Sequence, residues 1–176
     1  MTSTVAWAAL ANIPDDETID AYRVGMASPW SDPAVWEEKK RQESCPICVH
    51  GQPLDVLADF PASWVTGGED APLPGYACVF SKHHVIEPFH LPPADAGAFW
   101  GDVMAAARVL DLLFKPTKMN YEIHGNTIPH LHAHLFPRFA EDPFVGGPID
   151  PRRPQFKRTK DDLRRMRHAL EDALGS

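Results

Sequence analysis

The sequence has few cysteines and no long apolar run. Three cysteines in 176 residues do not provide the disulfide framework of a small secreted domain. No apolar run approaches the roughly 20 residues that a membrane-spanning helix needs. The segment VAWAALA at residues 5–11 lacks the basic flank and the length of a signal peptide. These absences predict a cytoplasmic protein without a membrane partner.

The chain also has no surplus of basic residues. Its 17 lysines and arginines are outnumbered by 24 aspartates and glutamates, which gives a formal net charge of -7. A protein that binds a nucleic-acid polymer needs a basic face to displace counterions, so we expect no nucleic-acid partner. A small anionic ligand can still bind at a local site. The length fits one domain with its own core.

Three histidines alternate in the segment NYEIHGNTIPHLHAHLFPR at residues 120–138. His130, His132 and His134 occupy every second position and are separated by apolar residues. Side chains alternate between the two faces of a strand, so the three imidazoles should share one face, roughly 6.5–7 Å apart along the strand. If the three imidazoles were buried in the core, each would need a hydrogen-bond partner. If they were exposed to solvent, nothing would favour a histidine at every second position. The row therefore predicts a functional site.

Two kinds of chemistry fit such a row. Histidines at positions i and i+2 can chelate one metal ion and leave a coordination position for water, as in a mononuclear zinc hydrolase. Alternatively, the central imidazole can act as a nucleophile that its neighbours support. The residue types of the row alone do not separate these alternatives.

The residues before the row favour the nucleophile. Gly125, Asn126 and Thr127 lead into the histidines, and the whole motif reads G-N-T-I-P-H-L-H-A-H-L. This pattern resembles the histidine triad (HIT) family, in which a glycine, an amide residue and a serine or threonine precede His-x-His-x-His. The resemblance covers roughly residues 45–139, where a CxxC, a strand that ends near a histidine, a long helix and the triad strand follow in the family's order.

The resemblance implies a hydrolase or nucleotidyl transferase that acts at the α-phosphate of a nucleotide conjugate, such as a dinucleoside polyphosphate (for example diadenosine polyphosphate) or a nucleoside phosphoramidate. His132 falls on the family's nucleophile and would form a covalent nucleotidyl-histidine intermediate. Asn126, Thr127 and His134 would stabilise the charge of the transferring group. A third histidine favours a hydrolase over the uridylyltransferase branch, which has glutamine there. The alternatives are the three-histidine zinc hydrolase and a non-catalytic nucleotide-binding module.

Further substrate contacts and a homodimer are also implied by the resemblance. Asn120 matches an asparagine that lines the family's phosphate site. The family's ribose-binding acid falls at Gly68 when counted back from His84, so Glu69 or Asp70 would serve only after a shift of one or two residues. Proteins of this family usually pair as homodimers.

A Zn²⁺ site is the second candidate centre. Cys45 and Cys48 have the spacing of a knuckle that places two thiolates on one metal ion, although a redox pair or two unrelated buried thiols would also fit. The resemblance to zinc-bearing members of the family supplies two more ligands, namely His84, with His83 as the fallback, and His130. Two thiolates and two imidazoles would form a closed, structural site.

The expected fold is α+β, with a HIT-like antiparallel sheet of about five strands, a long helix packed on it, and helical extensions at both ends. The expected organisation is a helical N-terminal extension (1–43), a HIT-like domain (44–140) and a C-terminal loop and helix packed on the same domain (141–176). An apolar stripe predicts the long helix at about 92–114. Caps predict further helices after Asp15 or Asp16, after Asp32, and after Thr159, where Leu174 should face inward.

Overall fold

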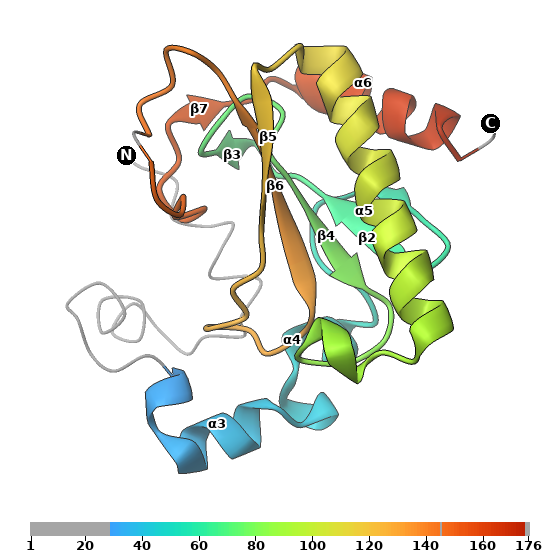
Figure 1. The fold of residues 1–176 in the computed structure, drawn as a ribbon, viewed down its shortest axis with the longest axis vertical. Coiled ribbons are helices and arrows are strands. Elements are labelled where there is room, and N and C mark those ends of the chain that lie inside the picture. Colours follow the sequence, from blue (N-terminus) through green and yellow to red (C-terminus); the bar gives the residue numbers. More distant parts are fainter. Residues whose placement is uncertain (1–28, 145, 175–176) are drawn as a thin grey trace.

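The computed structural model describes residues 29–144 and 146–174. The helix expected after Asp15 or Asp16 lies outside these residues. In the described part a five-stranded sheet is combined with helices (Figure 1), so the α+β prediction is confirmed.

The central sheet is antiparallel throughout and has the strand order β1-β2-β4-β6-β5. Its strands are β1 (Val56–Asp59), β2 (Ser63–Thr66), β4 (Ala77–Ser81), β5 (Lys118–Glu122) and β6 (His132–Arg138). The strand that contains His132 and His134, β6, is therefore hydrogen-bonded on both sides, and these two histidines lie in the interior of the sheet. The segment that leads into the histidine row forms β5, which is an edge strand of this sheet.

One face of the sheet is covered by α5 (Pro93–Phe114), which runs along it in Figure 1. Proline at the first helical position favours the start of α5, and the helix ends two residues before Pro116. Its apolar stripe meets the apolar side chains of the strands as the periodicity predicts. The shared core includes Val65, Val79, Ala133 and Leu135 from the sheet and Phe99, Val103 and Leu110 from the helix.

The opposite face carries the histidines and a second apolar cluster. At one end lies α4 (Pro46–His50), and at the other lies a small sheet of β3 (Asp70–Ala71) and β7 (Phe156–Lys157) (Figure 1). The loop between β6 and β7 also packs here, and Ile149 is buried among Tyr76 and Phe136. Segments distant in sequence thus enclose the histidine face.

The remaining elements flank the sheet. Asp32 caps α3 (Pro33–Lys39) with its carboxylate, and α6 (Lys160–Asp172) begins with a capping box of Thr159 and Asp162, as expected. Leu174 lies beyond the end of α6 and is 43% exposed, so the prediction that it faces inward is wrong.

The short 3₁₀ helices are η1 (Pro29–Ser31), η2 (Gln42–Ser44) and η3 (Pro88–His90). No helix in the described part is both long and apolar enough to cross a membrane.

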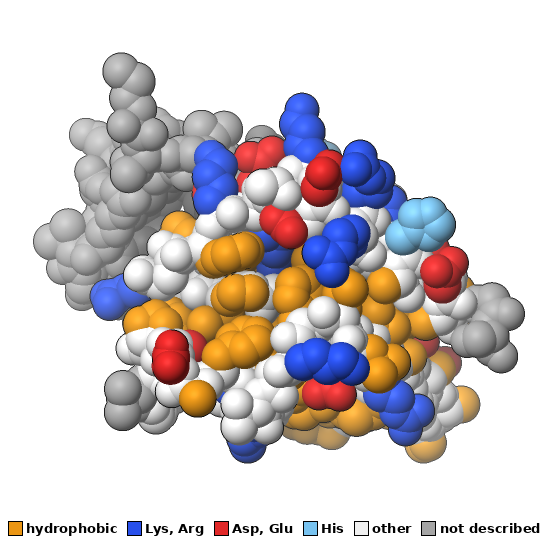
Figure 2. Space-filling model, turned by 90° about the horizontal axis from the view of Figure 1, so that it is seen from above, with side chains coloured by type: hydrophobic (Ala, Val, Ile, Leu, Met, Phe, Trp, Pro, Cys, Tyr) orange, Lys and Arg blue, Asp and Glu red, His pale blue; other side chains and the backbone are white. Residues whose placement is uncertain are grey.

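The surface at the upper end of the molecule, as it is oriented in Figure 1, carries both charged and hydrophobic side chains. Acidic and basic side chains are interspersed around patches of hydrophobic side chains (Figure 2). The exposed aromatic residue of β7, Phe156, belongs to this upper end of the molecule.

Candidate functional site

His132 and His134 lie on one face of the sheet, as their alternation predicts, whereas His130 precedes β6 and does not share that strand face. In the register of β4 and β6, Phe80 is opposite His132 and Cys78 is opposite His134. These four side chains point away from α5, while Ala133 and its apolar neighbours belong to the core beneath that helix. Both histidines are buried, so their imidazoles need partners within the protein.

The first histidine turns toward the cysteines instead of toward the other two. Nδ1 of His130 lies 3.3 Å from Sγ of Cys45 and 3.4 Å from Nδ1 of His84, and the latter atom lies 3.3 Å from Sγ of Cys48. A tetrahedral zinc ion with bonds of about 2.0–2.1 Å to nitrogen and 2.3 Å to sulfur holds its ligand atoms about 3.3–3.8 Å apart. The structure therefore brings together four ligand groups at distances that fit Zn²⁺.

Backbone carbonyls orient both imidazoles of this cluster. The Nε2–H group of His130 donates to the carbonyl of Ser81, and that of His84 donates to the carbonyl of Lys40, each at 2.8 Å. Because a carbonyl only accepts, these bonds place the hydrogen on Nε2 and direct the Nδ1 lone pairs at the thiols. The fallback ligand, His83, lies elsewhere, with Nε2 3.8 Å from Asp95.

The local sequence explains how the two cysteines reach one point. Cys45 is the N-cap of α4 and Pro46 is its first residue, while Gly51 ends the helix in the left-handed region at φ +82°. Cys45 and Cys48 therefore lie one turn apart on the same side of the helix. Burial lowers the pKa of His130 to about 4 and raises the pKa of Cys48 to about 12.

The central histidine has one ring nitrogen fixed and one free. The Nδ1–H group of His132 donates to the carbonyl of His130 at 2.6 Å, so Nε2 carries the lone pair. Burial lowers the pKa of His132, which keeps the ring neutral. The ring also stacks on Phe80 with centroids 4.9 Å apart. A neutral, oriented imidazole with a free Nε2 is chemically suited to nucleophilic attack.

Tyr76 orients the third histidine, and sequence reasoning missed this residue. The Tyr76 hydroxyl and Nδ1 of His134 share a hydrogen bond of 2.8 Å. Burial lowers the pKa of His134 well below its ordinary value, and the nearby His132 and His124 lower it further. Tyr76 lies two residues before Cys78, so extending the alternation of β4 by one step would have placed it on the histidine face.

The other predicted residues lie around this centre. Asn126 and Thr127 are exposed on the loop that precedes the row, and neither side chain forms a hydrogen bond with another described residue. Asn120 is on β5 opposite Phe136, and its Oδ1 accepts from Lys118 at 2.8 Å. Asn120 therefore lies near the His134 end of the row. Asn126 and Thr127 lie at the other end, before His130.

The predicted ribose-binding acids belong to the small sheet. Asp70 pairs with Lys157 between β3 and β7, and Glu69 is exposed beside it. A different carboxylate, that of Asp55, lies beside Gly68: a Cβ built on Gly68 would be 2.9 Å from Oδ2 of Asp55. No local pattern signals this approach, since Asp55 reaches it by adopting φ +53° in the turn before β1.

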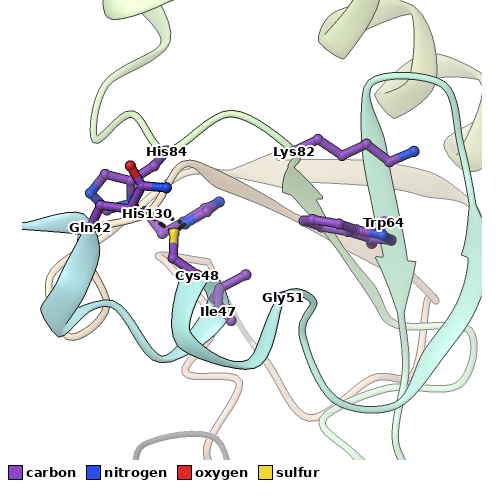
Figure 3. Close-up of a pocket in the computed structure, with 8 residues that line it drawn as sticks. All are labelled: Gln42, Ile47, Cys48, Gly51, Trp64, Lys82, His84 and His130. Carbon is purple, nitrogen blue, oxygen red and sulfur yellow. Dashed lines mark hydrogen bonds between the residues drawn. The ribbon is translucent and has the colours of Figure 1, made fainter.

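A cavity of about 150 Å³ lies between α4 and β2. Figure 3 shows Trp64 and Lys82 on one side of it and Cys48, His84 and His130 on the other. Its remaining lining residues are Gln42, Ile47 and Gly51.

This cavity is separate from His132. Trp64 pairs with Phe80 and Phe80 pairs with His132, so the three residues cross the sheet in one row. Adjacent strands are about 4.8 Å apart, which places Trp64 about 10 Å from His132 with Phe80 between them. The cavity therefore adjoins the cysteine cluster and not the central histidine.

The described residues also separate the two chemical alternatives for the row. Ligand-type side chains gather there in two groups, one of Cys45, Cys48, His84 and His130 and one of Cys78, His132 and His134. The three histidines are thus divided between two groups and do not converge on a single ion. This division favours a nucleophilic His132 over a three-histidine zinc centre.

Comparison with known proteins agrees with this geometry. No curated protein matches the chain. The chain is similar in structure to a histidine triad protein from Bradyrhizobium japonicum, with a TM-score of 0.60, 21% identity, and 68% of this chain and 89% of that chain covered. It is also similar to a histidine triad protein from Marinobacter aquaeolei, with a TM-score of 0.58, 23% identity, and 68% of this chain and 88% of that chain covered.

A third similar structure is a Zn-bound histidine triad family protein from Mycobacterium smegmatis, with a TM-score of 0.54 and 19% identity over 77% of this chain and 96% of that chain. These likenesses establish the fold. The sequence model of the HIT domain matches residues 51–141 of the 176, which include the entire histidine row. The chain therefore belongs to the histidine triad (HIT) domain family.

Proposed function

We propose that this protein is an enzyme that cleaves nucleotide conjugates, such as dinucleoside polyphosphates or nucleoside phosphoramidates, at the α-phosphate. One observation carries the proposal: His132 is a buried imidazole whose Nδ1–H group is held at 2.6 Å by the His130 carbonyl. That bond leaves Nε2 as the free nucleophilic nitrogen. Membership of the HIT family supports a nucleotide as the ligand, and a structural neighbour from Sulfolobus tokodaii is described as a hypothetical histidine triad nucleotide-binding protein.

The proposed reaction has two steps at phosphorus. Nε2 of His132 attacks the α-phosphorus in line, a P–N bond forms, and the bond to the leaving group breaks with its electron pair on that group. The Nδ1–H bond to the carbonyl stabilises the positive charge that the imidazole gains. Water then attacks phosphorus, releases a proton to solvent, and frees the imidazole.

Several groups are suited to stabilise the transferring phosphoryl group. His134 can donate from Nε2 when the Tyr76 hydroxyl donates to its Nδ1, and the exposed loop supplies the Asn126 amide and the Thr127 hydroxyl. Asn120 is the further phosphate contact that the family resemblance implies.

For the ribose we propose Asp55 in place of Glu69 or Asp70. Alternation along β2 turns Trp64 and Thr66 to the histidine face, since Ser63 bonds Asp102 of α5 on the other face. The next position of that face is Gly68, beside the Asp55 carboxylate. A carboxylate there can accept from ribose hydroxyls.

We also propose that Cys45, Cys48, His84 and His130 hold one structural Zn²⁺ ion. All four ligand positions would be filled by protein, so the ion would fix structure and leave no position for a catalytic water. The ligand distances and the second bonds of both imidazoles support this assignment, and the similar protein from Mycobacterium smegmatis is described as zinc-bound.

A homodimer is the proposed assembly. The edge strand β5 carries Tyr121, which is 45% exposed, and leaves a pairing edge available within the described part of the chain. Light scattering after size exclusion tests this proposal, and a mass of one chain at micromolar concentration would contradict it.

The decisive experiment traps the covalent intermediate. The protein is mixed with a panel of nucleotide conjugates, quenched rapidly, and measured as an intact chain by mass spectrometry. We expect an adduct with the mass of a nucleotidyl group, located on His132 by peptide mapping. The His132→Asn variant should still bind mononucleotide but form no adduct and lose several orders of magnitude in turnover.

Two results would refute the covalent mechanism. One is a His132→Asn variant with near-normal turnover on a conjugate that the wild type cleaves. The other is a wild type that turns over without any adduct at the earliest quench times. Nucleotide binding without cleavage of any conjugate would instead identify a non-catalytic binding module.

A further inference from the structure

Cys78 belongs to a second cluster of metal-ligating side chains. One ligand atom from each of Cys78, His132 and His134, the sulfur or a ring nitrogen, lies within 4.8 Å of those of the other two, and the three residues are buried. Cys78 is directly opposite His134 in the register of β4 and β6, and His132 is the diagonal neighbour. The cluster is therefore held by two hydrogen-bonded strands in the middle of the sheet.

Each member has a ligand atom that is not committed elsewhere. Cys78 is a free thiol. The Nδ1–H group of His132 is held by the His130 carbonyl, which leaves the Nε2 lone pair of that ring. His134 has its Nε2 lone pair in the tautomer whose Nδ1–H group donates to the Tyr76 hydroxyl oxygen, so this is the tautomer that would bind a cation. One thiolate and two imidazoles suit a thiophilic ion of the zinc type and not Mg²⁺ or Ca²⁺, which prefer oxygen ligands.

We propose that Cys78, His132 and His134 form a second site for a thiophilic divalent cation, of the class of Zn²⁺, and that the ion occupying it is a reversible inhibitor. Three protein ligands leave a fourth position for water. On binding, the Cys78 thiol releases its proton to solvent, a sulfur–metal bond forms, and no group is oxidised or reduced. The inhibitory part rests on the proposed function, because the ion would occupy the Nε2 lone pair with which His132 attacks phosphorus.

The second site should bind more weakly than the cysteine cluster. It has one thiolate where the cluster has two, and three protein ligands where the cluster has four. Free zinc can therefore be raised to fill the second site while the first stays loaded. This order makes the two sites separable in one titration of the full chain.

The first test counts ions. The zinc-loaded full chain is dialysed against increasing free Zn²⁺ and analysed for metal. We expect wild type to take up a second ion per chain, and Cys78→Ser and Cys78→Ala to keep the first ion but lose the second or bind it at least about tenfold more weakly. Equal uptake by wild type and both variants would overturn the proposal.

The second test uses wild type alone and thus does not depend on how the variants fold. Imidazole resonances of His132 and His134 are followed by NMR while Zn²⁺ is added to the zinc-loaded chain. A selective shift of these two rings is expected. A shift confined to exposed histidines such as His50 or His168 means an adventitious ion only and would overturn the site.

The third test separates inhibition from binding. Turnover of each protein is compared with its own rate before Zn²⁺ addition. Wild type should lose turnover as the second ion binds and regain it when a weak chelator removes that ion, while the Cys78 variants should need at least about tenfold more Zn²⁺. Activation by the second ion would overturn the inhibitory role. If wild type cleaves no conjugate, the proposed function fails, while ion counting and NMR still decide the site.

Discussion

At the scale of single residues, hydrogen bonds to backbone carbonyls determine what each histidine can do. His84, His130 and His132 each donate from one ring nitrogen to a carbonyl, and the other nitrogen then faces a thiol or the open side of the site. Because the carbonyl fixes the tautomer, three chemically identical side chains are divided between two roles: two proposed metal ligands and one proposed nucleophile.

Replacing His83 and His84 one at a time should show which of the two is the zinc ligand. His84→Ala removes a nitrogen 3.3 Å from Cys48 Sγ, whereas His83 lies toward Asp95. We expect His84→Ala to lose the bound zinc and His83→Ala to retain it, as measured by elemental analysis of protein purified without chelator. Zinc loss in His83→Ala alone would contradict this assignment of the ligand.

Tyr76 gives a residue-scale prediction for the third histidine. Tyr76→Phe removes a single hydrogen bond of about 1–1.5 kcal/mol, so turnover should fall about tenfold, with KM little changed. His134→Ala removes the whole side chain and should cost roughly 10² to 10³ in kcat. Steady-state kinetics check both values, and equal losses in the two variants would show that Tyr76 acts on more than His134.

At the scale of elements, a tight turn holds the end of β6. The Asp142 carboxylate accepts from the Arg138 guanidinium at 2.8 and 2.9 Å and from the backbone N–H groups of Phe139 and Phe144 at 3.0 Å each. Its side chain is only 3% exposed. These bonds turn the chain back so that the following loop packs against the histidine face.

The turn should therefore be a pH-dependent stabilising element. The Arg138 guanidinium lowers the pKa of Asp142. A lowered carboxylate pKa contributes stability above the unfolded value of about 3.9 that disappears as pH falls through the folded value.

Asp142→Asn should lower the free energy of unfolding by about 2 kcal/mol at pH 7, and the difference from wild type should shrink below about pH 4. Urea unfolding at several pH values measures this. Asp161→Asn is the matched control, because Asp161 pairs with Arg164 at the surface with 75% of its side chain exposed; its effect should stay below about 0.5 kcal/mol. A pH-independent loss in Asp142→Asn would mean that charge is not the cause.

At the scale of the whole molecule, the cysteine cluster connects segments that lie far apart in the sequence. It unites α4, the segment after β4 and the approach to β6, and the Lys40 carbonyl that holds His84 adds the residue that caps α3. A structural metal couples its binding free energy to folding, so the proposed ion would stabilise this end of the molecule.

Removal of that ion should be visible in thermal unfolding. Cys45→Ser should lose zinc and lower the Tm by roughly 10 °C. This shift corresponds to a loss of about 3–4 kcal/mol of stability, since each kcal/mol shifts the Tm of a domain of this size by about 2–4 °C. Cys78→Ser is the cysteine-matched control and should retain the first zinc ion. Full zinc retention in Cys45→Ser, by elemental analysis beside calorimetry, would contradict the assignment.

The sequence by itself determined the local and periodic features. Alternation placed His132 and His134 on one face and Ala133 on the other, an apolar stripe predicted α5, and Thr159 predicted the start of α6. These features depend on neighbours within a few residues, so they can be derived from the chain alone. The family motif added the ligand set that the structure brings together, and the fold class that it confirms.

Only the tertiary structure decided the contacts between distant segments. The bond of Tyr76 to His134, the approach of the Asp55 carboxylate to Gly68 and the grouping of Cys78 with the histidines depend on strand register and on turn conformations. The ring of His130 likewise turns to Cys45 and not along the row, because β6 begins only at His132. A one-residue change of register would exchange the faces, and no local pattern fixes that register between strands so far apart in sequence.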